Sequence, residues 1–541
     1  MSTSEYPAPR LDPPRLTGVR GLAARVATQV LADVWAVAGL IAVAAAIRIL
    51  TIDNQSFWTD EALTAYEAHL PFGGMITTVT HVETTPPLYF VLVWCWAKVF
   101  GTSEIALRSI STLAGIALVP IAYLSAKELA SRWAGVIAAA LVTVNPFLIW
   151  FSQEARSYML LATLTAAGFL WFVRALRDPS GRNLAWWAVC SALAVTTHFF
   201  AGFVVAPEAV WLLWIARSRA TWAAVAVVAA TQAAMLPFAL ADTTHGTGWI
   251  AAVPPMIRVG SGALEWGISL LRRTATANDG LIAAGALIVI VALLVLLAGD
   301  ERTRRAAKVG AAIGGFAIAA PLVLGSFGQD YWLSRNVIPA FIPLVVVIAA
   351  ACAAPRARVV GGALAVVLLA IFSYAAIDVQ THASLQRSPW RSVARALGPA
   401  PVPRAVLAAN GETNDPLKIY LPHVNWVVPQ DKRVRISEID IVGLARREPV
   451  AVALPRAASS REEALTTAAP PRAPQGQVVP RFLAPPGARL IARFRIVNWV
   501  IARFALRHPE RLDVKALLRL APRYFLHTPR SLLVFFQQPG R

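Results

Sequence analysis

Charged residues are scarce in this sequence. They make up 15% of its 541 residues, whereas a soluble domain carries about 25%. Hydrophobic residues make up 57% and lie in long runs, so a soluble globular enzyme is excluded. The composition predicts that lipid surrounds most of the chain.

Cysteine is nearly absent as well. The three cysteines, Cys95, Cys190 and Cys352, each lie in an apolar run, and none belongs to a C-x-x-C pair. This pattern excludes a disulfide framework and a cysteine zinc site.

Acidic residues are too few to balance the basic ones, and the net charge is +20. In a soluble protein such an excess points to nucleic acid. Here the basic residues cluster in short connections between apolar runs, which is the positive-inside pattern of membrane proteins, so no nucleic-acid partner is expected. The connections that carry the clusters contain Lys127 and Arg132; Arg174, Arg177 and Arg182; Arg217 and Arg219; Arg302, Arg304, Arg305 and Lys308; and Arg356 and Arg358.

The apolar runs predict about eleven transmembrane helices, since roughly 20 apolar residues cross a bilayer. They lie near 34–52, 105–126, 133–151, 157–176, 184–199, 201–216, 220–240, 280–298, 308–327, 334–353 and 359–377. With residues 1–33 as a cytoplasmic tail, every basic connection falls inside. No A-x-A cleavage site precedes a mature domain, which favours an uncleaved first helix over a signal peptide.

The apolar run Leu88–Phe100 is only about 13 residues long, which is short for a span. It carries Trp94, Trp96 and Lys98, residues that suit a membrane interface. If it spanned, all later basic connections would lie outside. We therefore expect this run to lie along the outer membrane surface.

The remaining segments are expected outside the membrane. The transmembrane domain, 34–377, includes an external loop at 53–87 and a long connection at 241–278. Residues 378–541 predict a small extracytoplasmic α/β domain, with strand-like runs at Ala405–Ala409 and Val450–Leu454. Residues 457–477, rich in Ala, Pro and Ser, predict a flexible loop.

The external loop carries an acidic pair, Asp60 and Glu61, behind the aromatic pair Phe57 and Trp58. A carboxylate at the interface can take the proton of an acceptor hydroxyl as that oxygen attacks a sugar carbon. The alternative is that these residues cap a helix running to Ala68. The residues alone leave both interpretations open.

Other polar residues lie at predicted outer ends of helices. His81 and Glu83 are weak candidates for a metal site, and a structural role is favoured for them. Charged groups at the mouth of a helix bundle mark a binding site or an ion pair, and guanidinium groups suit phosphate. The candidates for substrate binding are Glu83, Arg108, Glu154, Arg156, Tyr158 and Arg335.

The stretches WTDEA, TTPPLYF, ALRSIS, FSQEARSYMLL and YWLSRNVIPAFIPL, in this order, resemble the GT-C superfamily of glycosyltransferases. Within it they are similar to the branch of protein O-mannosyltransferases and lipid A aminoarabinose transferases. The resemblance covers roughly 34–377. It implies a GT-C-like fold, a polyprenyl-phosphate sugar donor and inversion at the anomeric carbon.

The resemblance also assigns residues. It implies that Asp60 is the catalytic base and that Glu83 lies near the donor phosphate. Relatives often carry His or Lys beside the double proline, where this chain has Thr84 and Thr85, which weakens any metal role. A divalent metal therefore stays open, and no cofactor is certain.

The sequence thus predicts a bacterial plasma-membrane glycosyltransferase that acts on the extracytoplasmic side. Asp60 acts as base and Glu61 assists it. The acceptor is a hydroxyl of a glycan, lipid or protein, and the enzyme itself contacts membrane lipid. The alternatives are a flippase for lipid-linked sugars and a non-catalytic envelope assembly protein. The sequence shows no evident inverted repeat, which counts against a transporter.

Overall fold

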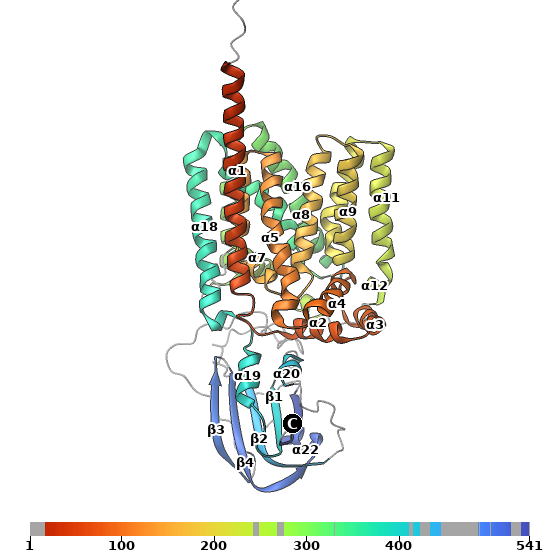
Figure 1. Ribbon diagram of the computed structural model, residues 1–541, viewed down its shortest axis with the longest axis vertical. Coiled ribbons are helices and arrows are strands. Elements are labelled where there is room, and N and C mark those ends of the chain that lie inside the picture. The colour runs from red at the N-terminus through yellow and green to blue at the C-terminus, as the bar shows by residue number, and fades with distance from the viewer. Residues whose placement is uncertain are drawn as a thin grey trace, which may run out of the picture.

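A helical bundle and a small sheet domain make up the protein (Figure 1). The computed structural model describes residues 17–241, 248–267, 275–328, 330–409, 415–421, 433–444, 485, 487–497, 499–520 and 532–539. The predicted fold class, a polytopic α-helical protein with a small C-terminal α/β domain, is confirmed. The strand expected at Val450–Leu454 and the loop at 457–477 lie outside the described residues.

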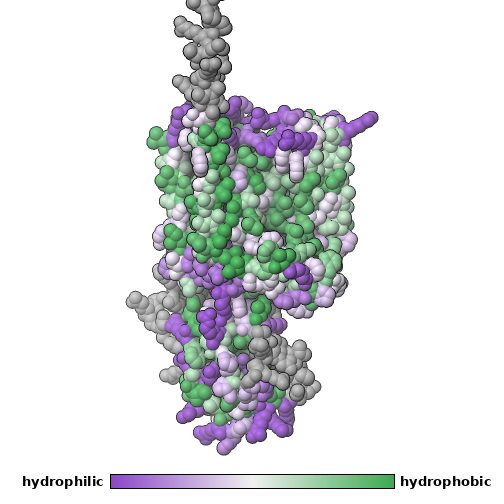
Figure 2. Space-filling model, in the orientation of Figure 1, coloured by the Kyte–Doolittle hydropathy of each residue, from purple (hydrophilic) through white to green (hydrophobic). Residues whose placement is uncertain are grey.

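The helices of the bundle follow one another in chain order. They are α1 (Thr17–Leu50), α2 (Thr59–His69), α3 (Phe72–Val82), α4 (Leu88–Phe100), α5 (Glu104–Leu129), α6 (Arg132–Val144), α7 (Pro146–Ser152), α8 (Tyr158–Ala175), α9 (Gly181–Thr197), η1 (Phe199–Ala201), α10 (Gly202–Ile215), α11 (Arg219–Ala234), α12 (Leu236–Ala241), α13 (Gly248–Ala251), α14 (Pro255–Gly267), α15 (Ala277–Leu293), η3 (Leu294–Ala298), α16 (Glu301–Ser326), η4 (Ile338–Ala340), α17 (Phe341–Cys352), η5 (Pro355–Ala357) and α18 (Arg358–Thr381). Figure 2 shows an apolar belt on the bundle, with polar residues gathered at both of its ends.

Helical segments occupy all eleven ranges predicted to span the membrane. By length and apolar composition, seven helices of the described residues can cross a bilayer, or eight if α6 and α7 form one bent span. The chain is therefore a multi-pass membrane protein. The helices at the other predicted spans, α9, α10 with η1, and η4 with α17, are shorter, so the count of eleven stays a prediction. Helix α1 begins at Thr17, well before the predicted start at 34.

Local sequence explains where the helices begin. Ser103 and Ser131 cap α5 and α6, because their side chains accept hydrogen bonds from the backbone N–H groups of Ala106 and Ala134. The helix predicted at 133–151 breaks at Asn145, which caps α7, and Pro146 follows as its first residue. The two halves meet at 59°.

Small residues bring α5 and α6 close together. Ala134 and Ala138 are fully buried in the core of the bundle. At Gly135 a Cβ atom would lie 2.8 Å from the carbonyl oxygen of Tyr123, too close for any other residue without a shift. In lipid, such close packing replaces the hydrophobic effect as the force that holds helices together.

Helices α2, α3 and α4 lie at the end of the bundle nearest the sheet domain (Figure 1). They share an apolar core that includes Phe57, Met75 and Phe90. This position agrees with the expectation that 88–100 lies along the membrane surface. This layer places the acidic pair, Asp60 and Glu61, beside the ends of α5 and α8.

The sheet domain follows α18. Its elements are η6 (Ala383–Leu385), α19 (Trp390–Leu397), β1 (Arg404–Ala409), α20 (Asp415–Tyr420), β2 (Val434–Leu444), β3 (Ala488–Ile496), β4 (Trp499–Leu512), α22 (Val514–Leu520) and β5 (Leu532–Gln537). The strand order is β3-β4-β2-β1-β5, in which only β1 and β2 run parallel. The strand predicted at Ala405–Ala409 is β1.

The sheet is covered on both faces, as the alternation of its strands requires. Val406 of β1 faces a core that includes Trp390 of α19, whereas Leu407 faces a second core with Leu517 of α22. The segment 382–397 and the Tyr420 hydroxyl bind to the bundle: Tyr420 Oη accepts a hydrogen bond from the backbone N–H of Phe57, at 2.8 Å. The sheet domain is thus fastened to the loop that carries the acidic pair.

Candidate active site

Asp60 and Glu61 lie in the first turn of α2 and point in different directions, because neighbouring helical residues are about 100° apart. The Glu61 side chain points into the protein and is 0% exposed, whereas Asp60 is partly exposed. The structure therefore separates two residues that the sequence cannot distinguish.

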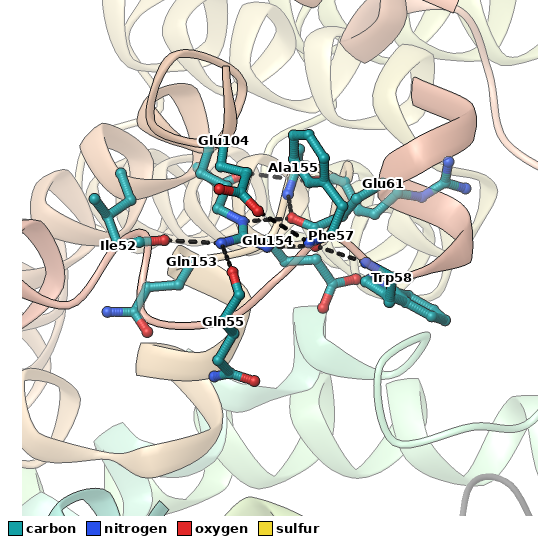
Figure 3. A network of polar contacts seen from close by, with 12 residues as sticks. Ile52, Gln55, Phe57, Trp58, Glu61, Glu104, Gln153, Glu154 and Ala155 are labelled. Atoms are coloured by element: carbon teal, nitrogen blue, oxygen red, sulfur yellow. Dashed lines mark hydrogen bonds and ion pairs between the residues drawn. The ribbon is translucent and has the colours of Figure 1, made fainter. Parts of the chain in front are cut away.

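The Glu61 carboxylate is bound on all sides (Figure 3). Its oxygens accept hydrogen bonds from Nε and Nη2 of Arg108, both at 2.7 Å, and from the backbone N–H of Ala155 at 2.8 Å. Arg387 Nη1 lies at 3.3 Å. Burial alone would raise the pKa of Glu61, but Arg108 and Arg387 outweigh it and lower the pKa. Glu61 is thus a permanently charged structural anchor and a poor base.

Arg108 has no donor left for a phosphate. Besides Glu61 it donates to the backbone carbonyls of Ile52, Gln55 and Ser56, at 2.9, 2.7 and 3.1 Å. These bonds use all five N–H groups of a guanidinium. The geometry disagrees with the predicted phosphate contact, and it makes Arg108 the residue that shapes the loop before α2.

Glu83 and Arg156 also pair with each other. Arg156 Nη1 and Nη2 donate to the two Glu83 oxygens, both at 2.6 Å, and both residues are 5% exposed. Arg156 Nη1 reaches Thr64 Oγ1 of α2 at 3.2 Å. The expected acidic group near the donor phosphate is therefore already neutralised, and one Arg156 donor, Nε, is buried without a partner among the described residues.

Glu154 pairs with Arg387, which the sequence analysis missed. Arg387 Nη2 lies 2.5 Å from one Glu154 oxygen, and Arg387 comes from the segment after the last membrane helix. Nothing near Arg387 in the sequence marks it as a site residue. Burial raises the pKa of Glu154 to about 7, although Arg387 opposes the shift. Its other oxygen, Oε1, is buried with no partner in the described part of the chain.

Arg335 lies near two aromatic rings, those of Trp58 and Tyr158, with its guanidinium carbon 5.9 and 5.7 Å from their centres. Its Nε is buried without a partner in the described ranges. No hydrogen bond or ion pair joins its guanidinium to a described residue. Among the described residues, the Arg335 guanidinium thus contacts only these two rings, and its donors stay available.

A second helix holds the segment that carries Arg335. Arg258 of α14 forms an ion pair with Asp330 and donates to the carbonyl of Trp332 at 3.0 Å. Trp266, also on α14, donates to the carbonyl of Ser334 at 3.1 Å. The connection 241–278, which the sequence analysis left without a role, therefore places Arg335.

Asp60 lies within electrostatic reach of Arg156, Arg335 and Glu154, because its charge contributes to the pKa of each. Its carboxylate has no hydrogen bond or ion pair to any residue that the structure describes. Around it, Glu61, Glu83 and Glu154 each have a guanidinium partner. Asp60 and Arg335 are the two charged groups of this cluster that lack an ion-pair partner among the described residues.

Glu67 is a further buried acid, two helical turns after Asp60 on α2. It is 1% exposed, and neither oxygen has a partner among the described residues. Burial, together with the charge of Glu83, raises the pKa of Glu67 to about 9. Glu67 is therefore a neutral carboxylic acid at neutral pH, and sequence analysis had no means to identify it.

The weak metal candidates are not assembled into a site. His81 is exposed at the end of α3, with Nδ1 2.8 Å from the carbonyl oxygen of Thr77. Glu83 is buried in its pair with Arg156. In the described ranges no group of three or more His, Cys, Asp or Glu side chains can hold a metal ion.

A family profile matches part of the chain. Residues 84–241 match the family described as dolichyl-phosphate-mannose-protein mannosyltransferase. The resemblance to O-mannosyltransferases predicted from the motifs is confirmed over this range. The range includes Arg108, Glu154, Arg156 and Tyr158 but begins after Asp60. No curated protein matches the sequence.

Two solved structures match the chain at low sequence identity. ArnT from Cupriavidus metallidurans in the apo state has a TM-score of 0.49 and 14% identity, over 87% of this chain and 98% of that chain. The S. cerevisiae protein O-mannosyltransferase Pmt1-Pmt2 complex bound to the sugar donor has a TM-score of 0.32 and 18% identity, over 42% and 36%. At these values the likeness assigns neither a residue role nor a substrate to this chain.

Proposed function

We propose that this protein is a membrane glycosyltransferase. It moves a sugar from a polyprenyl-phosphate donor to an acceptor hydroxyl at the extracytoplasmic face, with inversion at the anomeric carbon. Asp60 is the base, and Arg335 holds the leaving phosphate.

The observation that carries the proposal is the pattern of paired and unpaired charges at one end of the bundle. Three carboxylates are neutralised by three arginines, in the pairs Glu61–Arg108, Glu83–Arg156 and Glu154–Arg387. Among the residues that the structure describes, this leaves one charged carboxylate of the cluster without a partner, Asp60, and one guanidinium, Arg335, within electrostatic reach of each other. A transfer from a phosphate to a hydroxyl needs a proton acceptor and a cation, and these two residues can supply them.

The reaction follows from these two positions. The acceptor oxygen attacks the anomeric carbon, and its proton passes to a carboxylate oxygen of Asp60. The bond between that carbon and the phosphate oxygen breaks, and its electron pair leaves with the lipid phosphate. Arg335 stabilises the charge that develops on this phosphate, and cation–π contacts with Trp58 and Tyr158 hold the guanidinium in place. Attack opposite the leaving phosphate inverts the configuration.

Glu154 and Glu67 suit the hydroxyl groups of a sugar. With a pKa of about 7, Glu154 can act as donor or acceptor through its unpartnered oxygen. Glu67 is protonated and can donate. A site with buried groups that need hydrogen-bond partners discriminates strongly between substrates.

The family match supports the donor class. The description of the matched family names dolichyl phosphate mannose, a polyprenyl-phosphate sugar. The basic connections lie between predicted spans on the side opposite the site, which supports an extracytoplasmic location. The composition suits a bacterial plasma membrane.

The test is transfer by purified full-length protein and its Asp60→Asn variant, with a panel of radiolabelled polyprenyl-phosphate sugars. Asn keeps the size of Asp but cannot take the proton, so turnover should fall roughly 100- to 10,000-fold. Donor affinity should stay near that of the wild type. Asp53→Asn is the matched control, because Asp53 is an exposed carboxylate of the same loop. Equal turnover in Asp60→Asn and the control would exclude Asp60 as the base.

A further inference from the structure

A cavity lies away from the active site, between three helices of the bundle. Its volume is about 260 Å³, and its lining residues are Leu176, Trp211, Ile215, Arg305, Lys308 and Val309. The walls come from the ends of α8 and α10 and from the first turns of α16. The cavity thus combines apolar walls with a basic rim.

The cavity lies at the end of the bundle opposite the active site. Helix α8 begins at Tyr158, beside Arg335, and runs 18 residues to Ala175. At 1.5 Å per residue, Leu176 is about 27 Å from the site along the helix axis. Figure 2 shows polar residues at this end, beyond the apolar belt. The cavity thus opens where acyl chains meet headgroups.

The two cations on its rim are free. Arg305 and Lys308 are exposed and form no hydrogen bond or ion pair with any described residue. No acidic residue lines the cavity. A phosphate here meets two cations with no competing carboxylate, while Trp211 and Ile215 offer contact to the glycerol and the first methylenes.

We propose that this cavity binds the headgroup of an anionic diacyl phospholipid. Basic pockets between membrane helices recognise such headgroups, and each cation near an anionic surface strengthens binding by about 1 kcal/mol. The proposal is independent of the transfer reaction. A phosphodiester with two acyl chains fits the combination of a basic rim with apolar walls open to the bilayer.

The bound lipid would tie together helices that lead to the active site. Helix α8 carries Tyr158 at its other end, and α16 leads to the segment 330–336 with Arg335. Both helices contribute to the cavity. A lipid that joins their far ends should raise the thermal stability of the protein.

The test is native mass spectrometry of the purified full-length protein with phosphatidylglycerol or phosphatidylcholine carrying identical acyl chains. The wild type should bind the first phosphatidylglycerol at least about tenfold more tightly than phosphatidylcholine. In Arg305→Gln/Lys308→Gln the affinity for phosphatidylglycerol should fall about 30-fold, the factor expected for two cations. Arg302→Gln/Arg358→Gln removes the same charge outside the cavity and should leave this affinity unchanged.

A second variant separates the cavity from surface charge. Ile215→Trp keeps both cations and fills the space, so it should also weaken phosphatidylglycerol binding by at least about tenfold. If either cavity variant binds phosphatidylglycerol like the Arg302→Gln/Arg358→Gln control, the proposal is refuted. Equal wild-type affinity for both lipids would refute it too, as would tighter capture of a polyprenyl phosphate at this cavity.

Discussion

Glu61→Gln removes the negative charge from the centre of the buried network. Gln has the size of Glu, but its amide nitrogen would face a guanidinium donor where an oxygen now accepts. Arg108, fully buried, would keep only backbone carbonyls and one amide oxygen as partners. Breaking one side of a buried ion pair costs about 3–5 kcal/mol. The unfolding entropy of about 2.1 cal/mol/K per residue sums to about 1.1 kcal/mol/K over 541 residues, so the melting temperature should fall by about 3–5 °C.

From the sequence, Glu61 was expected to assist Asp60, whereas in the structure it lies at the centre of a buried ion-pair network. The assay is thermal unfolding of detergent-purified protein, followed by size-exclusion chromatography, beside transfer activity. Asp60→Asn is the matched variant: its carboxylate is partly exposed and unpaired, so its melting temperature should stay within about 1–2 °C of the wild type. If Glu61→Gln melts like the wild type and is inactive, while Asp60→Asn keeps its turnover, Glu61 is the base and our reasoning fails.

Three further predictions use other parts of the site. Arg335→Lys should lower transfer about 10- to 100-fold, through loss of a charge-assisted hydrogen bond to phosphate, with an unchanged melting temperature; Arg156→Lys should instead lower the melting temperature, because it breaks a buried two-bond pair. Wild-type transfer in Arg335→Lys would leave that residue without a role in phosphate binding. Burial raises the pKa of Glu67 from 4.5 to about 9, so the folded state holds a proton that the unfolded state releases, and stability should fall as pH rises across this window. Glu67→Gln should flatten the melting temperature between pH 5 and 9, and an unchanged pH profile would contradict the assignment. A cysteine placed at Gly73 or Gly181, where the structure leaves open space, should react with an impermeant reagent on intact cells at Gly73 only; labelling at Gly181 would overturn the topology.

Much of the fold could be predicted because lipid imposes a local rule. A chain in a bilayer must satisfy its backbone polar groups within each helix, so long apolar runs become helices wherever they occur. The eleven predicted ranges are all helical for this reason. The length and the tryptophans of the short run Leu88–Phe100 predict a surface location, and the helix lies at the end of the bundle nearest the sheet domain. The acidic loop could be singled out as well, since charged residues beside apolar helices are costly and rarely incidental.

The sequence by itself therefore determined the helices, their order and the end of the bundle at which the polar residues gather. Only the tertiary structure decided which carboxylate meets which arginine. Asp60 and Glu61 are neighbours of similar chemistry, and they differ because Glu61 meets Arg108 and Arg387, 47 and 326 positions away in the chain. Arg387 lies beyond the last membrane helix and reaches the site only because the sheet domain docks there. The charge of a buried acid depends on partners brought together by packing, and no local pattern in the sequence carries that information.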